Sequence, residues 1–311
     1  MIDTCQNIHQ IGQLHTIQTQ SIDFEKVNLS FFSLKESPQF WKGMDNLSGP
    51  NYQGIFDITM TYRHDSEVHL AYGNLINRTT HEKIQPNSFI DYYDENQFVN
   101  LTEIGLTELA KRPKDIAWLV SHCDTMSKRE NYVEEMQKYK GLKIDVFGKC
   151  GNNTSEIPER NANRWATLTA YTKLASSYKF YLSFENSRCY DYITEKIFLA
   201  LKVGMIPVVL GGLTKHDYKK IAPPHSFLHV DDFSSPEDLM KRMHAIANDP
   251  QIYNSYFWWR LHYGVVVNDP CCSNQSYIDP GCQLCNVLNA NEIIQKNDYT
   301  NFTTFWNKCR N

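Results

Sequence analysis

The chain has 311 residues and a mass of 36.3 kDa, and this length predicts two domains of about 150 residues each. Its hydrophobic fraction of 41% is ordinary for a globular protein, and its 12 Pro and 14 Gly exclude collagen-like and low-complexity classes. The net charge of −4 calls for no basic surface, so we expect no nucleic-acid partner.

The first residues show neither a basic start nor an apolar run, so no signal peptide is visible and the chain as given is expected to be soluble. The longest apolar stretch, residues 197–213, is interrupted by Lys202, Gly204 and Pro207. A helix followed by a buried strand explains this stretch better than a membrane span of about 20 residues does.

The sequons and cysteines indicate the secretory lumen. Composition alone predicts about three Asn-x-Ser/Thr sequons, whereas the chain has them at Asn28, Asn46, Asn77, Asn100, Asn152, Asn153, Asn274 and Asn301. Five cysteines gather near the C-terminus: Cys271, Cys272, Cys282, Cys285 and Cys309. Disulfides are the favoured interpretation of these cysteines, and the alternative is a zinc site formed by Cys271 or Cys272 with the pair Cys282 and Cys285.

The first part of the chain, residues 1–113, predicts a separate, smaller α/β domain. Residues 27–32 and 56–62 alternate like strands, and in the second of these the apolar residues share one face. A boundary near residues 111–114 is expected because Pro113 restricts the residue before it and a charged turn separates two apolar segments.

From residue 114 to the end at residue 311, the pattern alternates between strands and helices. Residues 116–120 predict a buried strand, residues 127–139 a helix that Gly141 caps, and residues 144–147 the next strand. Such a strand, helix and strand form one βαβ unit of a parallel sheet.

The same unit recurs further along the chain. The expected order is a helix at 165–178, a strand at 180–184, a helix at 193–203 ending at Gly204, and strands at 205–210 and 227–230. Ser235 followed by Pro236 and two acidic residues predicts another helix start. This half is therefore expected to be an α/β, Rossmann-like domain with a Cys-rich C-terminal tail.

The densest candidate for chemistry is residues 184–196, which leave a strand and open a helix. If Asp191 caps that helix, Tyr192 and Lys196 share one helix face and Glu195 lies in the first turn. Free N–H groups, the helix dipole and the Lys196 ammonium then predict a phosphate site. An ordinary solvated helix start is the alternative. Gly-x-Gly-x-x-Gly and the P-loop are both absent, which argues against NAD and ATP hydrolysis.

Residues 180–187 and 191–196 closely resemble the signature of the α-1,3-fucosyltransferase family. Further ordered matches lie at residues 59–66, 117–121, 207–211, 222–233 and 256–260, so the resemblance spans roughly residues 36–260. It implies an inverting glycosyltransferase that moves L-fucose from GDP-fucose to the 3-hydroxyl of N-acetylglucosamine in a glycan. Such enzymes have two facing Rossmann-like domains of GT-B type, which implies that residues 1–113 form the acceptor-side domain and residues 114–311 the domain that binds GDP-fucose. The resemblance also implies the Golgi lumen and a membrane anchor that this chain lacks, with an N-terminal domain that is shortened.

The resemblance assigns roles to six residues. Glu36 matches the catalytic base, Arg129 and Lys196 match the pyrophosphate-binding cations, and Asn186, Tyr192 and Glu195 match donor-binding positions, with Glu195 on the ribose. Glu67 is the rival base.

No Asp-x-Asp occurs in the chain, so we expect no required metal or other cofactor, and stimulation by Mn²⁺ remains compatible with this mechanism. The competing interpretation of the whole chain is a catalytically silent relative that binds nucleotide or glycan.

Overall fold

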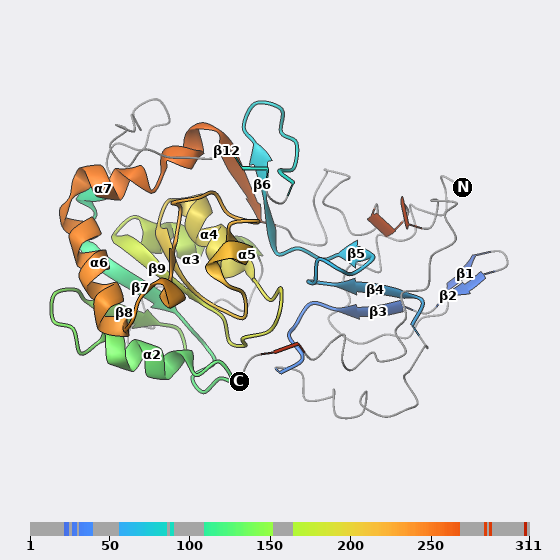
Figure 1. Ribbon diagram of the computed structural model, residues 1–311, viewed down its shortest axis with the longest axis horizontal. Coiled ribbons are helices and arrows are strands. Elements are labelled where there is room, and N and C mark those ends of the chain that lie inside the picture. Colours follow the sequence, from blue (N-terminus) through green and yellow to red (C-terminus); the bar gives the residue numbers. More distant parts are fainter. Residues whose placement is uncertain are drawn as a thin grey trace. The chain divides into compact units, whose positions relative to one another are not determined.

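The structure is a computed structural model that describes residues 22–24, 27–29, 31–39, 56–85, 88–89, 109–151, 164–267, 283–284, 286–287 and 308–309 (Figure 1). Its contacts divide the chain into two compact units. Unit 1 combines Met1–Tyr72, Ser187–Ile193 and Asn268–Asn311, and unit 2 combines Gly73–Asn186 and Thr194–Val267. Both units are therefore built from segments that lie far apart in the sequence.

Unit 2 is built on a parallel sheet of five strands. In spatial order these are β11 (Leu228–His229), β10 (Ile206–Leu210), β9 (Tyr178–Phe184), β7 (Lys114–Leu119) and β8 (Ile144–Phe147). The strands β9 and β10 are buried almost throughout, as expected when helices cover both faces of a sheet. Chain order reverses between β7 and β9, and ligands of such sheets bind beside this switch point, at the carboxyl ends of the strands.

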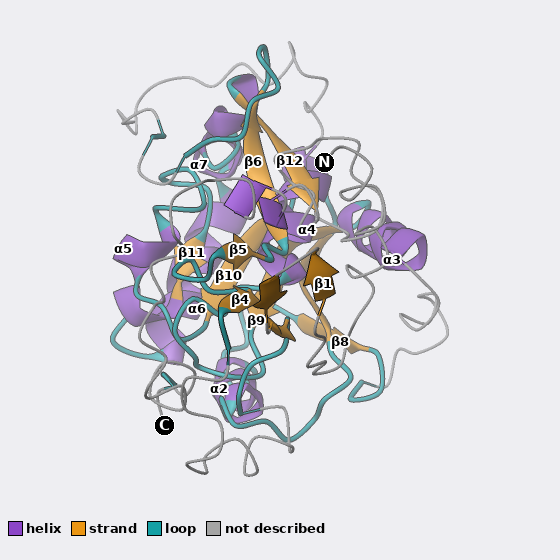
Figure 2. Cartoon of the chain, turned by 90° about the vertical axis from the view of Figure 1, so that its right-hand side faces the viewer, coloured by secondary structure: helices purple, strands orange, loops and turns teal. Residues whose placement is uncertain are grey.

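Four helices cover this sheet. On one face, α2 (Arg129–Met136) packs against α6 (Pro236–Asn248), and both contribute to the main apolar core. Elsewhere α3 (Arg164–Ala175) contacts α4 (Glu195–Val203), and α4 contacts β9 and β10. Figure 2 shows α3 and α6 on opposite sides of β9 and β10. Unit 2 is thus a doubly wound α/β fold.

An antiparallel ribbon completes unit 2. Its strands are β6 (Gly73–Asn77) and β12 (Tyr263–Val267), and α4 contacts both of them. Gly73 is required there, because a Cβ atom at this position would lie 2.3 Å from the Phe198 ring on α4. The shorter elements are η5 (Leu109–Lys111), α5 (Lys215–Tyr218), η6 (Val230–Asp232), α7 (Pro250–Ser255) and η7 (Trp258–Leu261).

The described part of unit 1 contains two small sheets. One is the antiparallel pair β1 (Ile22–Phe24) and β2 (Val27–Leu29), and the other is a parallel sheet in the order β3 (Phe31–Leu34), β4 (Ile58–Thr61), β5 (Val68–His69). The predicted strands at 27–32 and 56–62 are confirmed in kind. However, all four residues of β4 are buried, so both of its faces pack against protein.

Most predicted elements of the second half are confirmed to within a few residues, but Gly141 is not the cap of a helix. Gly204 ends α4 in the left-handed conformation, with φ of 79°, and Ser235 caps α6 by accepting the N–H of Asp238. Gly141 does not cap α2, because that helix ends at Met136 and Gln137 is its right-handed C-cap. The helix ends earlier because the next N–H groups, of Lys138 and Tyr139, bond to carbonyls three residues back instead of four.

Two disulfides lie in the described residues. Cys123–Cys150 joins the loops that follow β7 and β8, and Cys189–Cys309 joins two segments of unit 1. The disulfide interpretation is thus confirmed for Cys309, while Cys271, Cys272, Cys282 and Cys285 lie outside the described residues. Over the described ranges, no three His, Cys, Asp or Glu residues group as metal ligands would. No helix of that same part has the length and apolarity to cross a bilayer.

Candidate functional site

The predicted site segment is divided between the two units. Glu185 and Asn186 follow the carboxyl end of β9 in unit 2, residues 187–193 belong to unit 1, and the chain returns to unit 2 at Thr194, directly before α4. The end of β9 borders the switch point of the sheet. The two parts of the segment therefore supply two separate sets of candidate residues.

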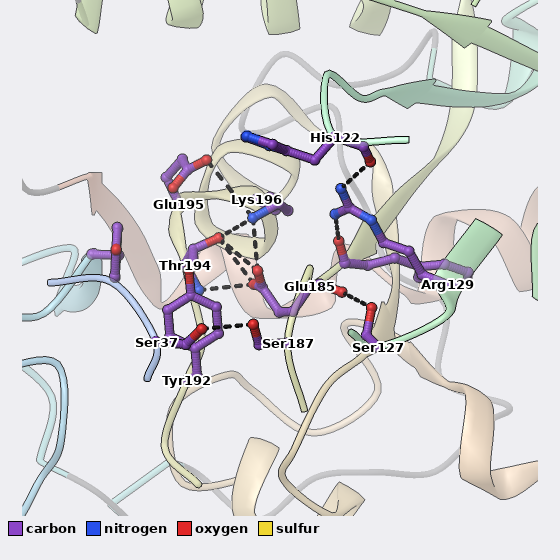
Figure 3. Close-up of polar contacts among 12 residues, drawn as sticks. Ser37, His122, Ser127, Arg129, Glu185, Ser187, Tyr192, Thr194, Glu195 and Lys196 are labelled. Carbon is purple, nitrogen blue, oxygen red and sulfur yellow. Dashed lines mark hydrogen bonds and ion pairs between the residues drawn. The ribbon is translucent and has the colours of Figure 1, made fainter. Parts of the chain in front are cut away.

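A buried carboxylate organises the part in unit 2. Glu185 Oε1 accepts the backbone N–H of Thr194 at 2.8 Å, and Glu185 Oε2 accepts the Lys196 ammonium at 2.7 Å (Figure 3). The Thr194 hydroxyl lies 3.0 Å and 2.9 Å from the two carboxylate oxygens and accepts an N–H from Lys196. Glu185 and Lys196 form an ion pair with side chains only 2% and 11% exposed. This pair places a positive charge in the first turn of α4.

The hypothesis that Asp191 is the N-cap of α4 is wrong. The N-cap of α4 is Thr194, and its side chain makes no capping hydrogen bond because its hydroxyl is bonded to Glu185. Asp191 has φ of 59° and accepts the backbone N–H of His64 instead. Tyr192 consequently precedes the helix and does not share a helix face with Lys196. The positive end of the α4 dipole lacks a side-chain cap from its own N-cap residue.

Arg129 joins the strands on either side of the switch point. The Arg129 guanidinium donates to the carbonyl of Phe184 at 2.6 Å and to that of His122 at 3.1 Å. These carbonyls follow β7 and lie at the end of β9. The guanidinium lies 5.7 Å from the Trp118 ring and the residue is 3% exposed. Arg129 therefore fixes the loops that border the site.

Two further predicted residues lie at the same edge of unit 2. Within the described residues, the buried side-chain oxygen of Asn186 has no hydrogen-bond partner, which is rare for a buried polar atom. Glu195 Oε1 lies 4.0 Å from Lys196 Nζ. The structure thus gathers Arg129, Asn186, Glu195 and Lys196 around the end of β9 and the start of α4.

The remaining predicted residues, Glu36 and Tyr192, meet in unit 1. The Tyr192 hydroxyl donates to Glu36 Oε2 at 2.8 Å, across 156 positions of sequence. Tyr192 is 2% exposed, and the Tyr62 ring packs edge-on against it at 5.0 Å. Next to this pair, the hydroxyls of Ser37 and Ser187 are 2.6 Å apart (Figure 3). Burial raises the pKa of the Tyr62 phenol.

The rival carboxylate, Glu67, has a structural partner. Glu67 Oε2 accepts both the backbone N–H of Thr59 at 2.7 Å and the Thr59 hydroxyl at 2.8 Å. Thr59 is fully buried in β4. This geometry indicates that Glu67 holds the loop before β5 onto β4.

Glu185, Thr194 and Ser127 are the residues that the sequence interpretation missed. Ser127 donates its hydroxyl to the carbonyl of Glu185 at 2.7 Å, which ties the loop before α2 to the end of β9. Glu185 stood inside the singled-out segment, and a carboxylate directly after a buried strand was the available signal. Its partners are nine and eleven residues away, so no local pattern showed the pairing.

Comparisons with known proteins agree on one family. Residues 109–305 match the model of glycosyltransferase family 10 (fucosyltransferase), C-terminal part. The chain is 36% identical to alpha-(1,3)-fucosyltransferase C of Drosophila melanogaster, over 83% of this chain and 56% of that protein. It is 35% identical to glycoprotein 3-alpha-L-fucosyltransferase A of the same organism, over 80% and 42%, and 32% identical to alpha-(1,3)-fucosyltransferase 4 of Bos taurus, over 81% and 54%. The chain spans about half the length of these relatives.

Solved structures of the same kind are also similar. An alpha1,3-fucosyltransferase with GDP-fucose matches with a TM-score of 0.46 at 19% identity, over 75% of this chain and 67% of that one. An alpha1,3-fucosyltransferase with GDP matches with a TM-score of 0.48 at 15% identity, over 95% and 88%.

Proposed function

This chain belongs to glycosyltransferase family 10, the fucosyltransferases, and we propose that it transfers L-fucose from GDP-fucose to the 3-hydroxyl of N-acetylglucosamine in a glycan, with inversion. The observation that carries this proposal is the gathering of Arg129, Asn186, Glu195 and Lys196 at the carboxyl end of β9, beside the switch point of the sheet. The relatives named alpha-(1,3)-fucosyltransferases support the same reaction.

Unit 2 is proposed to bind the donor. The Lys196 ammonium and the first turn of α4 attract the diphosphate, because both present positive charge at the same helix end. Asn186 offers a buried oxygen to a donor hydroxyl, and Glu195 is assigned to the ribose. Arg129 contributes its charge from the loops that it fixes. These roles require no metal, although Mn²⁺ is compatible with them.

Unit 1 is proposed to bind the acceptor and supply the base. Glu36 takes the proton from the acceptor 3-hydroxyl while that oxygen forms a bond to the anomeric carbon of fucose. The bond from that carbon to GDP breaks in the same displacement, and the departing diphosphate carries away the electron pair. One displacement turns the β-linked donor sugar into an α-fucoside. A covalent enzyme intermediate is therefore unnecessary.

The compartment proposed for this reaction is the Golgi lumen. The disulfides Cys123–Cys150 and Cys189–Cys309 support an oxidising environment. A GT-B architecture, with unit 1 on the acceptor side and unit 2 on the donor side, is part of the same proposal.

The purified chain should release GDP and form a fucoside when incubated with GDP-fucose and a panel of glycans that end in N-acetylglucosamine. Product analysis by mass spectrometry and NMR identifies the linkage. Parallel reactions with EDTA and with added Mn²⁺ test the metal, and we expect EDTA to reduce the rate little. Binding of GDP without any turnover would contradict the proposal and favour the silent relative.

Glu36→Gln should lower turnover by about 10²–10⁴-fold and leave GDP affinity unchanged, because only the proton acceptor is lost. Glu67→Gln is the matched control: it should lower the free energy of unfolding, since Glu67 accepts two hydrogen bonds from buried Thr59. Calorimetry with GDP and steady-state rates separate the two effects. Near-normal transfer by Glu36→Gln, together with an inactive Glu67→Gln that still binds GDP, would move the base to Glu67.

A further inference from the structure

We propose that Glu185 is the positioning residue of the donor site: its carboxylate aims the Lys196 ammonium at the diphosphate and makes no contact with the substrate. This inference rests on the proposed function and deepens it. Lys196 alone, on a flexible side chain at a helix start, would have many rotamers. The contacts of Glu185 select one of them.

Both oxygens of the Glu185 carboxylate accept hydrogen bonds from groups of the protein. Each of its oxygens lies within hydrogen-bond distance of two donors, which come from Thr194 and Lys196 (Figure 3). Its side chain is 2% exposed. These groups supply three hydrogens to the carboxylate, since the Thr194 hydroxyl has only one, and the side chain is almost fully buried. We therefore infer that it acts through its neighbours.

Lys196 has the complementary geometry. Among the described residues, two of its three N–H groups point to Glu185 Oε2 and the Thr194 hydroxyl. The side chain retains 11% exposure. The ammonium also lies 4.0 Å from Glu195 Oε1, beyond hydrogen-bond distance. We assign the third N–H and this exposed fraction to a diphosphate oxygen, at the first turn of α4. Glu185 therefore determines where the positive charge lies relative to the helix end.

A second cluster in the chain has the same kinds of donors around a carboxylate, but it lies at a short helix and its ammonium is exposed. Asp217 accepts the N–H and hydroxyl of Thr214 and, at 2.8 Å, the ammonium of Lys220. It forms the capping box of α5, and the Lys220 side chain is 37% exposed. Because α5 has only one turn and this ammonium is exposed, the cluster serves the helix alone. It provides a matched control for the buried cluster.

The test is calorimetric titration of the whole chain with GDP, with guanosine as the phosphate-free control. Lys196→Met should weaken GDP binding about 10- to 100-fold, because a charge-assisted contact is lost. Glu185→Gln should weaken it about tenfold, because the neutral amide has one acceptor oxygen and cannot accept from both the Thr194 N–H and the Lys196 ammonium. Added to Lys196→Met, the same Glu185→Gln change should instead tighten GDP binding, because it removes an unpaired negative charge.

The effect of Glu185→Gln on GDP affinity is therefore expected to have opposite signs with and without Lys196, which distinguishes a positioning role from a general structural role. If Glu185→Gln tightens or does not change GDP binding while Lys196 is present, or weakens it equally in both backgrounds, the inference is overturned. Thr194→Val provides a second variant should Glu185→Gln not fold: it should weaken GDP binding only when Lys196 is present, and equal weakening in both backgrounds overturns the inference. Asp217→Asn should lower thermal stability and leave GDP affinity unchanged. If the unaltered chain binds no GDP, the proposed function fails and this inference fails with it.

Discussion

Single hydrogen bonds decide the roles of the candidate residues. Tyr192 was assigned to the donor by resemblance, whereas its hydroxyl donates to Glu36. Because this phenol occupies Oε2 of the carboxylate, it fixes which oxygen is available to the acceptor. Tyr192 is therefore expected to act on the rate of proton removal.

Tyr192→Phe should lower kcat about tenfold, because a hydrogen bond to a charged group contributes about 1.5–3 kcal/mol, and should leave the Kd for GDP unchanged. Tyr178→Phe is the matched control, since buried Tyr178 donates to the Asp145 carboxylate at 2.7 Å in unit 2. It should lose stability and retain turnover. Weaker GDP binding with normal kcat in Tyr192→Phe would return this residue to the donor.

At the level of elements, helix starts show which predictions local sequence supports. The start of α6 was predictable because Ser235, Pro236 and the acidic first turn act within four residues. The start of α4 was not, because Asp191 bonds to His64, 127 residues away, and Thr194 bonds to Glu185. Hydrogen bonds to residues distant in sequence therefore decided this helix start, although Asp191 is a favourable cap by local sequence.

The cap of α6 can be measured directly. Ser235→Ala should lower the free energy of unfolding by about 1 kcal/mol, because the N–H of Asp238 loses its acceptor, whereas Ser235→Gly should cost only about 0.3 kcal/mol. Urea unfolding of both variants gives the comparison. Equal losses would mean that the Ser235 hydroxyl is not the stabilising group.

Across the whole molecule, sequence reasoning succeeded where contacts are local or strands are buried. The βαβ pattern predicted the sheet of unit 2, because its strands are apolar runs separated by helices. Unit 1 was predicted less well, since it includes Ser187–Ile193 and Asn268–Asn311, far from its first strands in sequence. The strands β6 and β12 pair although they also lie far apart in sequence, so no local pattern predicted their pairing. The domain boundary near residue 113 stays a prediction.

His225 should make the global stability depend on pH. It lies before β11 with φ of 55°, its ring stacks on Tyr256 at 4.1 Å, and its Nε2 is 2.8 Å from the Ser255 hydroxyl. Burial, with the nearby charges of Arg242 and Lys215, lowers the pKa of His225 from 6.5 to about 4. The unfolded chain therefore binds a proton that the native chain does not between these values. This contribution to stability is complete above pH 6.5 and is lost as the pH falls toward about 4.

Replacing His225 removes that proton, so His225→Asn should reduce the slope of unfolding free energy against pH by about 1.4 kcal/mol per unit across this interval. Asparagine is chosen because it tolerates the left-handed backbone. His81→Asn is the control, since His81 has φ of 61° and an exposed side chain, and it should keep the original slope. Urea unfolding at half-unit steps of pH measures all three proteins. If the plots of unfolding free energy against pH are parallel for His225→Asn and the unaltered chain from pH 6.5 to 4, His225 is not the group that makes the fold acid-sensitive.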